Sequence, residues 1–141
     1  MTVAPTSYRL ADELKRRLAA HASAEGISET SLVSRILDEA LRTADHPGIV
    51  YRDGPGGRRA ALAGGPDVWQ VVGAVRHAPG RGEAKVAGAA EQMDLPARLV
   101  RLAIDFAAAH PQEIEQAIAA NDAAAAHARD LAAERARLMA S

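Results

Sequence analysis

The sequence predicts a mainly helical protein: a strand with two helices, then a β-hairpin with further helices, then a long C-terminal helix. Three observations predict this class. Apolar residues recur at helical spacing through most of the chain. Turns rich in Gly and Pro interrupt that pattern at 43–48, 54–57, 63–66 and 78–82. Aromatic residues make up only 3% of the chain, so the cores must be built from Ala, Leu, Val and Ile, which favours closely packed helices.

The first predicted element is a short strand over residues 6–10. Tyr8 and Leu10 alternate there with Ser7 and Arg9, as in a strand with one buried face. Two helices are expected to follow, because Gly26 can end the first in the left-handed conformation and Ser28 can cap the second.

One strand and two short helices have too little interior to fold alone. We therefore expect a dimer in which two strands pair antiparallel above four helices. The apolar residues at strand and helix spacing predict its contacts: Tyr8, Leu10, Leu14, Leu18, Leu32, Val33, Ile36 and Leu37.

This unit, residues 1–44, resembles the ribbon-helix-helix family of bacterial DNA-binding proteins. The matching residues are Ser7-Tyr8-Arg9-Leu10, Asp12-Glu13-Leu14, Leu18 and Gly26-Ile27-Ser28-Glu29-Thr30-Ser31-Leu32-Val33. The resemblance implies that the ribbon enters the major groove, where Ser7 and Arg9 read base edges. It also implies that the helix start at Ser28, Glu29 and Thr30 contacts a phosphate. The alternative interpretation is a dimerisation ribbon that does not bind DNA.

The middle segment, residues 45–110, begins with a predicted hairpin of strands 49–53 and 58–62. The same glycines could form a phosphate loop, but no Gly-Lys-Ser/Thr follows them. Asp67 is a plausible cap for a helix over 68–77, in which Trp69 is interpreted as a core anchor rather than a base-stacking platform.

Two further helices, over 83–93 and 97–109, are expected around the tight break Asp94-Leu95-Pro96. This spacing is typical of a helix-turn-helix, with Asp94 left-handed in the turn. Arg98 and Arg101 would then share the outward face of the second helix. The alternative is a plain helical hairpin with two solvated arginines. The predicted interior residues are Ala89, Met93, Leu95, Val100 and Ala103.

The chain from His46-Pro47-Gly48 to Gln112-Glu113-Ile114 contains a second set of motifs: Gly57-Arg58-Arg59, Pro66-Asp67-Val68-Trp69, Leu99-Val100-Arg101, Ala103-Ile104-Asp105-Phe106 and His110-Pro111-Gln112-Glu113-Ile114-Glu115. With these residues it resembles the small winged-helix domain of antitoxins whose partners are PIN-like ribonuclease toxins. The resemblance implies that Arg58 and Arg59 are wing residues that touch phosphate.

The tail, residues 111–141, has the high Ala content of a strong helix former but few large apolar residues. Such a helix suits binding in the groove of a partner protein, through Ile118, Leu131, Arg135 and Leu138. A frayed, solvated helix is the other interpretation.

Composition limits the remaining functions. The net charge is −1 and no segment is strongly basic, so DNA affinity must come from a few placed arginines and from the dimer. There is no Cys, the five His are dispersed, and no catalytic grouping is evident, so we expect neither an enzyme nor a cofactor. No apolar run reaches membrane-spanning length and no signal segment is evident, which predicts a cytoplasmic protein without a membrane partner.

Together these features predict an antitoxin-type transcriptional regulator that dimerises, binds double-stranded operator DNA and neutralises a toxin, which the second resemblance implies is a PIN-like ribonuclease. The alternative is a free-standing dimeric repressor without a toxin partner, in which the tail serves only assembly. A third hypothesis is an interaction protein that does not bind DNA.

Overall fold

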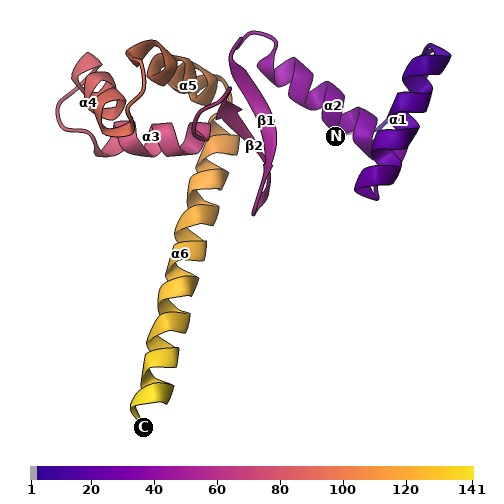
Figure 1. Cartoon of the computed structure of the whole chain (residues 1–141). Helices are drawn as coiled ribbons and strands as arrows, with labels where there is room; N and C mark the ends of the chain where they lie inside the picture. Colours follow the sequence, from indigo (N-terminus) through magenta and orange to yellow (C-terminus); the bar gives the residue numbers. More distant parts are fainter. Residues whose placement is uncertain (1–2) are drawn as a thin grey trace. The chain divides into compact units, whose positions relative to one another are not determined.

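The computed structural model of the chain describes residues 3–141, which form six helices and one antiparallel β-hairpin. The prediction of a mainly helical chain with a hairpin after the first two helices is confirmed (Figure 1). Contacts divide the chain into two compact units: the first ends at Ala44 and the second begins at Asp45. Within the described range, no helix is both long and apolar enough to span a bilayer.

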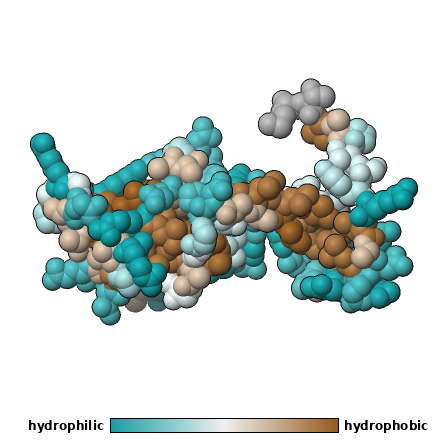
Figure 2. All heavy atoms as spheres, turned by 90° about the horizontal axis from the view of Figure 1, so that it is seen from above, coloured by the Kyte–Doolittle hydropathy of each residue, from teal (hydrophilic) through white to brown (hydrophobic). Residues whose placement is uncertain are grey.

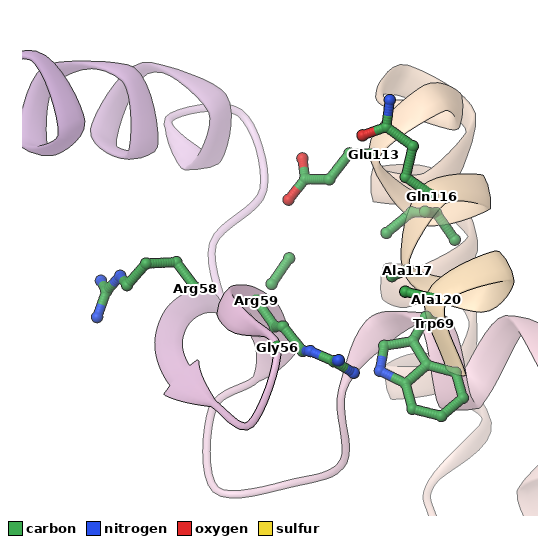
Figure 3. A pocket seen from close by; sticks show the side chains of 10 residues that line it. Gly56, Arg58, Arg59, Trp69, Glu113, Gln116, Ala117 and Ala120 are labelled. Carbon is green, nitrogen blue, oxygen red and sulfur yellow. The ribbon is translucent and has the colours of Figure 1, made fainter. Parts of the chain in front are cut away.

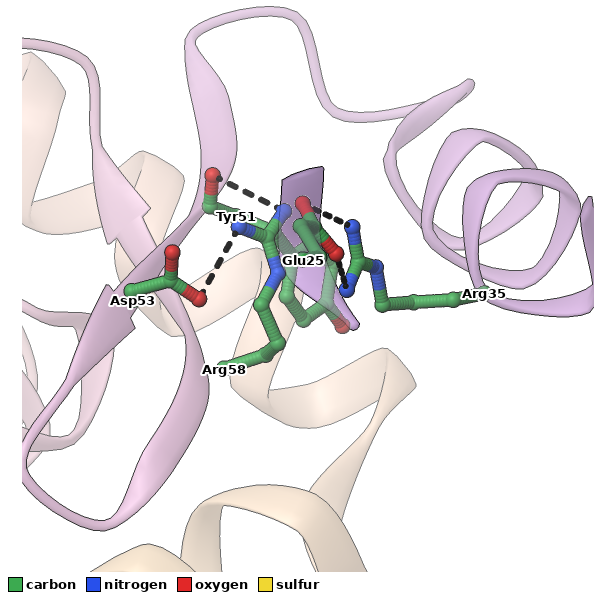
Figure 4. Close-up of polar contacts among 5 residues, drawn as sticks. All are labelled: Glu25, Arg35, Tyr51, Asp53 and Arg58. Atoms are coloured by element: carbon green, nitrogen blue, oxygen red, sulfur yellow. Dashed lines mark hydrogen bonds and ion pairs between the residues drawn. The ribbon is translucent and has the colours of Figure 1, made fainter. Parts of the chain in front are cut away.

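The first unit contains helices α1 (Asp12–Glu25) and α2 (Glu29–Thr43). Gly26 ends α1 at φ 70°, in the predicted left-handed conformation, which a side chain with a Cβ adopts only at a cost. Ser28 caps α2, because its Oγ accepts a hydrogen bond from the Ser31 N–H at 3.0 Å. An ion pair between Arg35 and Glu25, 2.8 Å long, joins the two helices (Figure 4).

This unit has almost no interior of its own. Among residues 3–44, only Ala22 and Leu32 are buried. Residues 3–11 form neither a strand nor a helix in the single chain. The predicted strand over 6–10 needs a second copy to pair with, so it stays a prediction. Figure 2 shows apolar side chains gathered along α2 at the surface.

The second unit begins with strands β1 (Ile49–Gly54) and β2 (Gly57–Leu62), which pair antiparallel from Ile49 opposite Leu62 to Gly54 opposite Gly57. Pro55 and Gly56 form the loop between them, as the Gly/Pro pattern predicts. Helices α3 (Val68–His77), α4 (Glu83–Met93), α5 (Ala97–Ala109) and α6 (Pro111–Ala140) follow, so the predicted helices of this unit are confirmed.

One core serves the hairpin, α3, α4, α5 and the first turns of α6. Phe106 is its largest fully buried side chain, and His46, Tyr51 and His110 lie around the Phe106 ring with centroids 4.7 to 6.4 Å away. The other buried apolar residues are Ile49, Ala60, Ala61, Leu62, Val68, Val71, Ala74, Ala78, Val86, Ala89, Val100, Ala103 and Ile114.

Helix α6 is anchored only at its beginning. Ile114 is buried in the core, and the Tyr51 hydroxyl donates to the Glu113 carboxylate, with its oxygens 2.7 and 2.8 Å away. Arg76 of α3 forms an ion pair with Glu115. From residue 121 to residue 140 the side chains are exposed, except that of Ala126, which is half-exposed.

Candidate nucleic-acid and partner interfaces

The turn between α4 and α5 places two helices against each other in the second unit. Asp94 lies at φ 53° and ψ 49°, the predicted left-handed conformation, and its N–H donates to carbonyl groups at the end of α4. Ala89, Val100 and Ala103, three of the residues predicted to be interior, have no exposed surface. The small side chains of Ala89 and Ala103 allow α4 and α5 to approach closely.

That outward face carries Arg98 and Arg101, both exposed. Arg101 forms an ion pair with Glu83 at the start of α4, 2.6 Å long. The hydrogen bond from Arg101 lowers the pKa of Glu83 and raises that of Arg101. Within residues 3–141, Arg98 forms neither a hydrogen bond nor an ion pair, so its guanidinium is available to a phosphate.

The hairpin places Arg58 and Arg59 in different surroundings. The Arg58 Nη1 lies 3.4 Å from the Asp53 Oδ1, and its Nη2 lies 3.5 Å from the Tyr51 carbonyl oxygen (Figure 4). The Arg59 side chain is only 18% exposed, and its guanidinium lies 5.6 Å from the centroid of the Trp69 ring. Arg59 therefore stabilises the hairpin, whereas Arg58 is the more accessible of the two.

Asp67 holds this end of the hairpin to α3. Its carboxylate accepts hydrogen bonds from Arg52 at 2.8 Å and from the Trp69 indole N–H at 3.1 Å, and lies 3.9 Å from Arg59. The Asp67 backbone N–H donates to Gln70 Oε1 at 2.9 Å, so Asp67 is also the cap of α3, as predicted. The sequence does not reveal this carboxylate as the partner of two arginines.

A hollow of about 290 Å³ lies between the hairpin and the first turns of α6. Figure 3 shows Arg59 pointing toward Trp69 at its wall, and Arg58 pointing away. The opposite wall is helical, and comprises Glu113, Ile114, Gln116, Ala117 and Ala120.

The predicted base-reading residues of the first unit, Ser7 and Arg9, are exposed, as are Ser28, Glu29 and Thr30 at the start of α2. The predicted dimer contacts differ in burial. Leu32 is buried, Leu18 and Val33 are half-buried, and the others are exposed: Tyr8, Leu10, Leu14, Ile36 and Leu37. An exposed apolar face of this kind, on a unit with two buried residues, is typical of an interaction surface.

The predicted contacts of the tail separate into two groups. Ile118 packs against the core of the second unit, where it helps to hold the start of α6. Leu131, Arg135 and Leu138 are exposed on the part of the helix that has no support. Helix α6 therefore has an anchored beginning, which includes Ile118, and an unanchored end, which carries Leu131, Arg135 and Leu138.

The contacts that anchor α6 could not be predicted from the sequence. Glu113 and Glu115 belong to the matching residues of the second resemblance, but their partners Tyr51 and Arg76 lie 62 and 39 positions away along the chain and carry no recognisable motif. His46 and His110, two of the five His that are dispersed along the sequence, have rings 6.0 Å apart beside Phe106. Both histidines therefore pack against the Phe106 ring.

Replacement of Glu115 by Gln should lower the thermal midpoint of the second unit slightly at neutral pH. The hydrogen bond from Arg76 lowers the pKa of Glu115 below its ordinary value of 4.5, so the ionised pair stabilises the folded state above that pH. This contribution is lost as the pH falls through the lowered pKa of the folded state.

Thermal unfolding at pH 7 and in acid measures the effect. The wild-type and E115Q midpoints should differ at pH 7 and converge in acid. Glu91→Gln is the matched control, because Glu91 is exposed and pairs with no residue among 3–141. An E115Q difference that persists unchanged in acid would exclude the ion pair as its cause.

Comparison of the chain with family models, with curated proteins and with solved structures finds no match.

Proposed function

We propose that the protein is an antitoxin-type transcriptional regulator, which dimerises through its first unit, binds operator DNA and neutralises a toxin with α6. The proposed toxin class, a PIN-like ribonuclease, rests on the resemblance of the second unit to the winged-helix domain of antitoxins, through motifs from Gly57-Arg58-Arg59 to His110-Pro111-Gln112-Glu113-Ile114-Glu115. One observation carries the proposal: the first of two compact units has an uncovered apolar face, the second has an exposed arginine, Arg98, on the outward face of α5, and α6 is almost entirely exposed beyond residue 120.

The first unit supports the proposal through its uncovered apolar face. In a ribbon-helix-helix dimer, a second copy covers Tyr8, Leu14 and Leu37, and the strands pair so that Ser7 and Arg9 point into the major groove. Tyr8 is 76% exposed and Leu37 49% exposed in the single chain, so both have area to bury in such a dimer.

The second unit supports the proposal through α5. If α4 and α5 act as a helix-turn-helix, α5 presents Arg98 to the DNA, and Arg58 reaches the backbone from the hairpin. Dimerisation doubles both contacts, which compensates for the nearly neutral charge of each copy.

Co-expression with the product of the adjacent reading frame tests the toxin-binding part. A toxic neighbour that becomes harmless and co-purifies with the full chain supports the proposal. A chain ending at residue 120 is the matched control, because it keeps Ile114 and Ile118 but lacks the bare end of α6. The absence of any complex with a harmless neighbour would contradict the proposal.

Replacement of Arg9 by Ala should weaken binding to the specific operator by about 1–3 kcal/mol, because Arg9 is the strand residue suited to a bidentate contact with guanine. Binding to unrelated duplexes should change much less. Fluorescence anisotropy with both duplexes measures the difference, and Arg16→Ala on α1 serves as the control. Unchanged operator affinity in R9A would count against the ribbon as the reader.

The ion pairs of the arginines favour a second function, that of an assembly protein that does not bind DNA. Arg52, Arg58 and Arg101 each have a carboxylate partner within the second unit, as expected of a DNA-free assembly protein. A salt titration of duplex binding distinguishes the DNA-binding regulator from the assembly protein. Phosphate contacts cause a steep decrease in duplex affinity with increasing salt, whereas an assembly protein shows no such decrease. A free-standing repressor behaves like the antitoxin in this titration but does not bind the neighbouring protein.

A further inference from the structure

The hollow between the hairpin and the first turns of α6 has space and apolar surface for a small flat ring. Its volume is about 290 Å³, and its lining includes the Trp69 indole of α3 and the methyl groups of Ala117 and Ala120 on α6 (Figure 3). Larger side chains at these two positions of α6 would occupy the space that the alanines leave open. Concave sites of this kind, with mostly apolar walls and few polar groups, are where proteins bind small molecules.

Arg59 brings to this hollow a guanidinium that forms no hydrogen bond with any residue among 3–141. Its side chain is only 18% exposed, and its ion-pair partner, the Asp67 Oδ2, lies 3.9 Å away, which is too far for a hydrogen bond. The contact with the Trp69 ring attracts the positive charge but supplies no oxygen acceptor. Donors that are mostly buried and lack an acceptor are costly, so an acceptor that enters the hollow is favoured.

The turn of the hairpin leaves room for this guanidinium. A Cβ at position 56 would lie 2.7 Å from the Arg59 Nη2, so a side chain there would displace the Arg59 head group. Gly56 lacks that atom, and the guanidinium lies between the turn and the Trp69 ring. The cation is therefore held at the wall of the hollow.

The charges around the hollow favour a ligand with a single negative charge. The Asp67 carboxylate accepts a hydrogen bond from Arg52 at 2.8 Å, so its one negative charge is shared between Arg52 and Arg59. One positive charge is thus left for an anion beside Arg59. On the helical wall the Glu113 carboxylate, which accepts from the Tyr51 hydroxyl, disfavours a second negative charge on the ligand.

From this combination we infer that the hollow binds a small aromatic carboxylate. The carboxylate of the ligand accepts hydrogen bonds from the Arg59 guanidinium, whose fork matches its two oxygens. The ring of the ligand packs against Trp69, Ala117 and Ala120. This site does not depend on the proposed function, because the DNA contacts proposed for the second unit use Arg58 and Arg98.

Titration of the full chain with benzoate tests the inference. Trp69 is the only Trp of the chain, so its fluorescence and its indole N–H resonance both report on this hollow. Both signals should change saturably, with a dissociation constant in the millimolar range or below. Benzamide has the ring without the charge and acetate has the charge without the ring, so each should bind at least about 10-fold more weakly than benzoate.

Two variants with matched controls locate the site. Arg59→Gln should weaken benzoate binding by at least about 10-fold and remove its advantage over benzamide. Arg81→Gln removes the same charge from the exposed loop before α4 and should leave the affinity unchanged. Ala117→Leu fills the hollow but keeps Arg59, so it should weaken both ligands, whereas Ala119→Leu at an exposed position of α6 should weaken neither.

A response of Trp69 that rises linearly with benzoate and never saturates would overturn the inference, as would equal affinity for benzoate and either benzamide or acetate. Equal weakening by Arg59→Gln and Arg81→Gln would also overturn it, because the net charge alone would then explain binding. Unchanged binding in Ala117→Leu would place the ligand outside the hollow. These titrations contain neither DNA nor toxin, so their failure leaves the proposed function untouched.

Discussion

Replacement of Phe106 by Ala should destabilise the second unit by about 3–5 kcal/mol, the largest effect expected of a single substitution in this chain. Phe106 has no exposed surface and is surrounded by His46, Tyr51 and His110, which come from three different segments. Its removal leaves a cavity that these rings, held by their own backbone contacts, fill only in part.

Denaturant unfolding followed by Trp69 fluorescence measures this effect, since Trp69 is the only Trp of the chain and lies in the second unit. Leu131→Ala is the control: it also truncates a large apolar side chain, but one that is 58% exposed, so a change within about 0.5 kcal/mol is expected. A loss below about 1 kcal/mol in F106A would show that the core repacks around the cavity.

Replacement of Ile36 by Lys should raise the dissociation constant of the dimer by at least about 100-fold, or about 2.7 kcal/mol. Ile36 is 48% exposed in the single chain, so the ammonium group remains in water in the monomer and the fold of the unit is kept. In the proposed dimer the same group is buried without a partner, once from each copy, at a cost of several kcal/mol.

Sedimentation equilibrium measures the shift toward the monomer, and circular dichroism shows whether the helices are retained. Ser34→Lys adds the same charge at an exposed position outside the apolar stripe of α2, and should leave the dimer intact. Equal masses for I36K and wild type would place the dimer contact elsewhere on the chain.

The local features of the fold could be predicted from the sequence because each is decided within a few residues. Gly26 and Asp94 adopt the predicted left-handed conformation. Ser28 and Asp67 are the caps of α2 and α3, as predicted. Turn and cap preferences depend on neighbouring backbone groups, so a single sequence carries this information.

The contacts of the arginines could not be predicted, because they depend on the packing of distant segments. Arg59 and Trp69 come together only when β2 lies beside α3, and the carboxylate that holds Arg76 lies 39 residues away. The hairpin arginines look equivalent in the sequence, yet Arg59 packs on an indole ring while Arg58 pairs with Asp53. The predicted strand over residues 6–10 is absent from the single chain, so its pairing with a second chain stays a prediction.

Because α6 is anchored only at its beginning, its end can be degraded while the second unit stays folded. No buried residue lies beyond Ile114 in the part of the chain that the structure describes, so loss of the last 20 residues removes no core contact. Arg129, Arg135 and Arg137 are exposed there as cleavage sites for a protease that cuts after basic residues. Proteolysis of an uncovered tail would therefore leave a chain that still folds but has lost the segment proposed to hold the toxin.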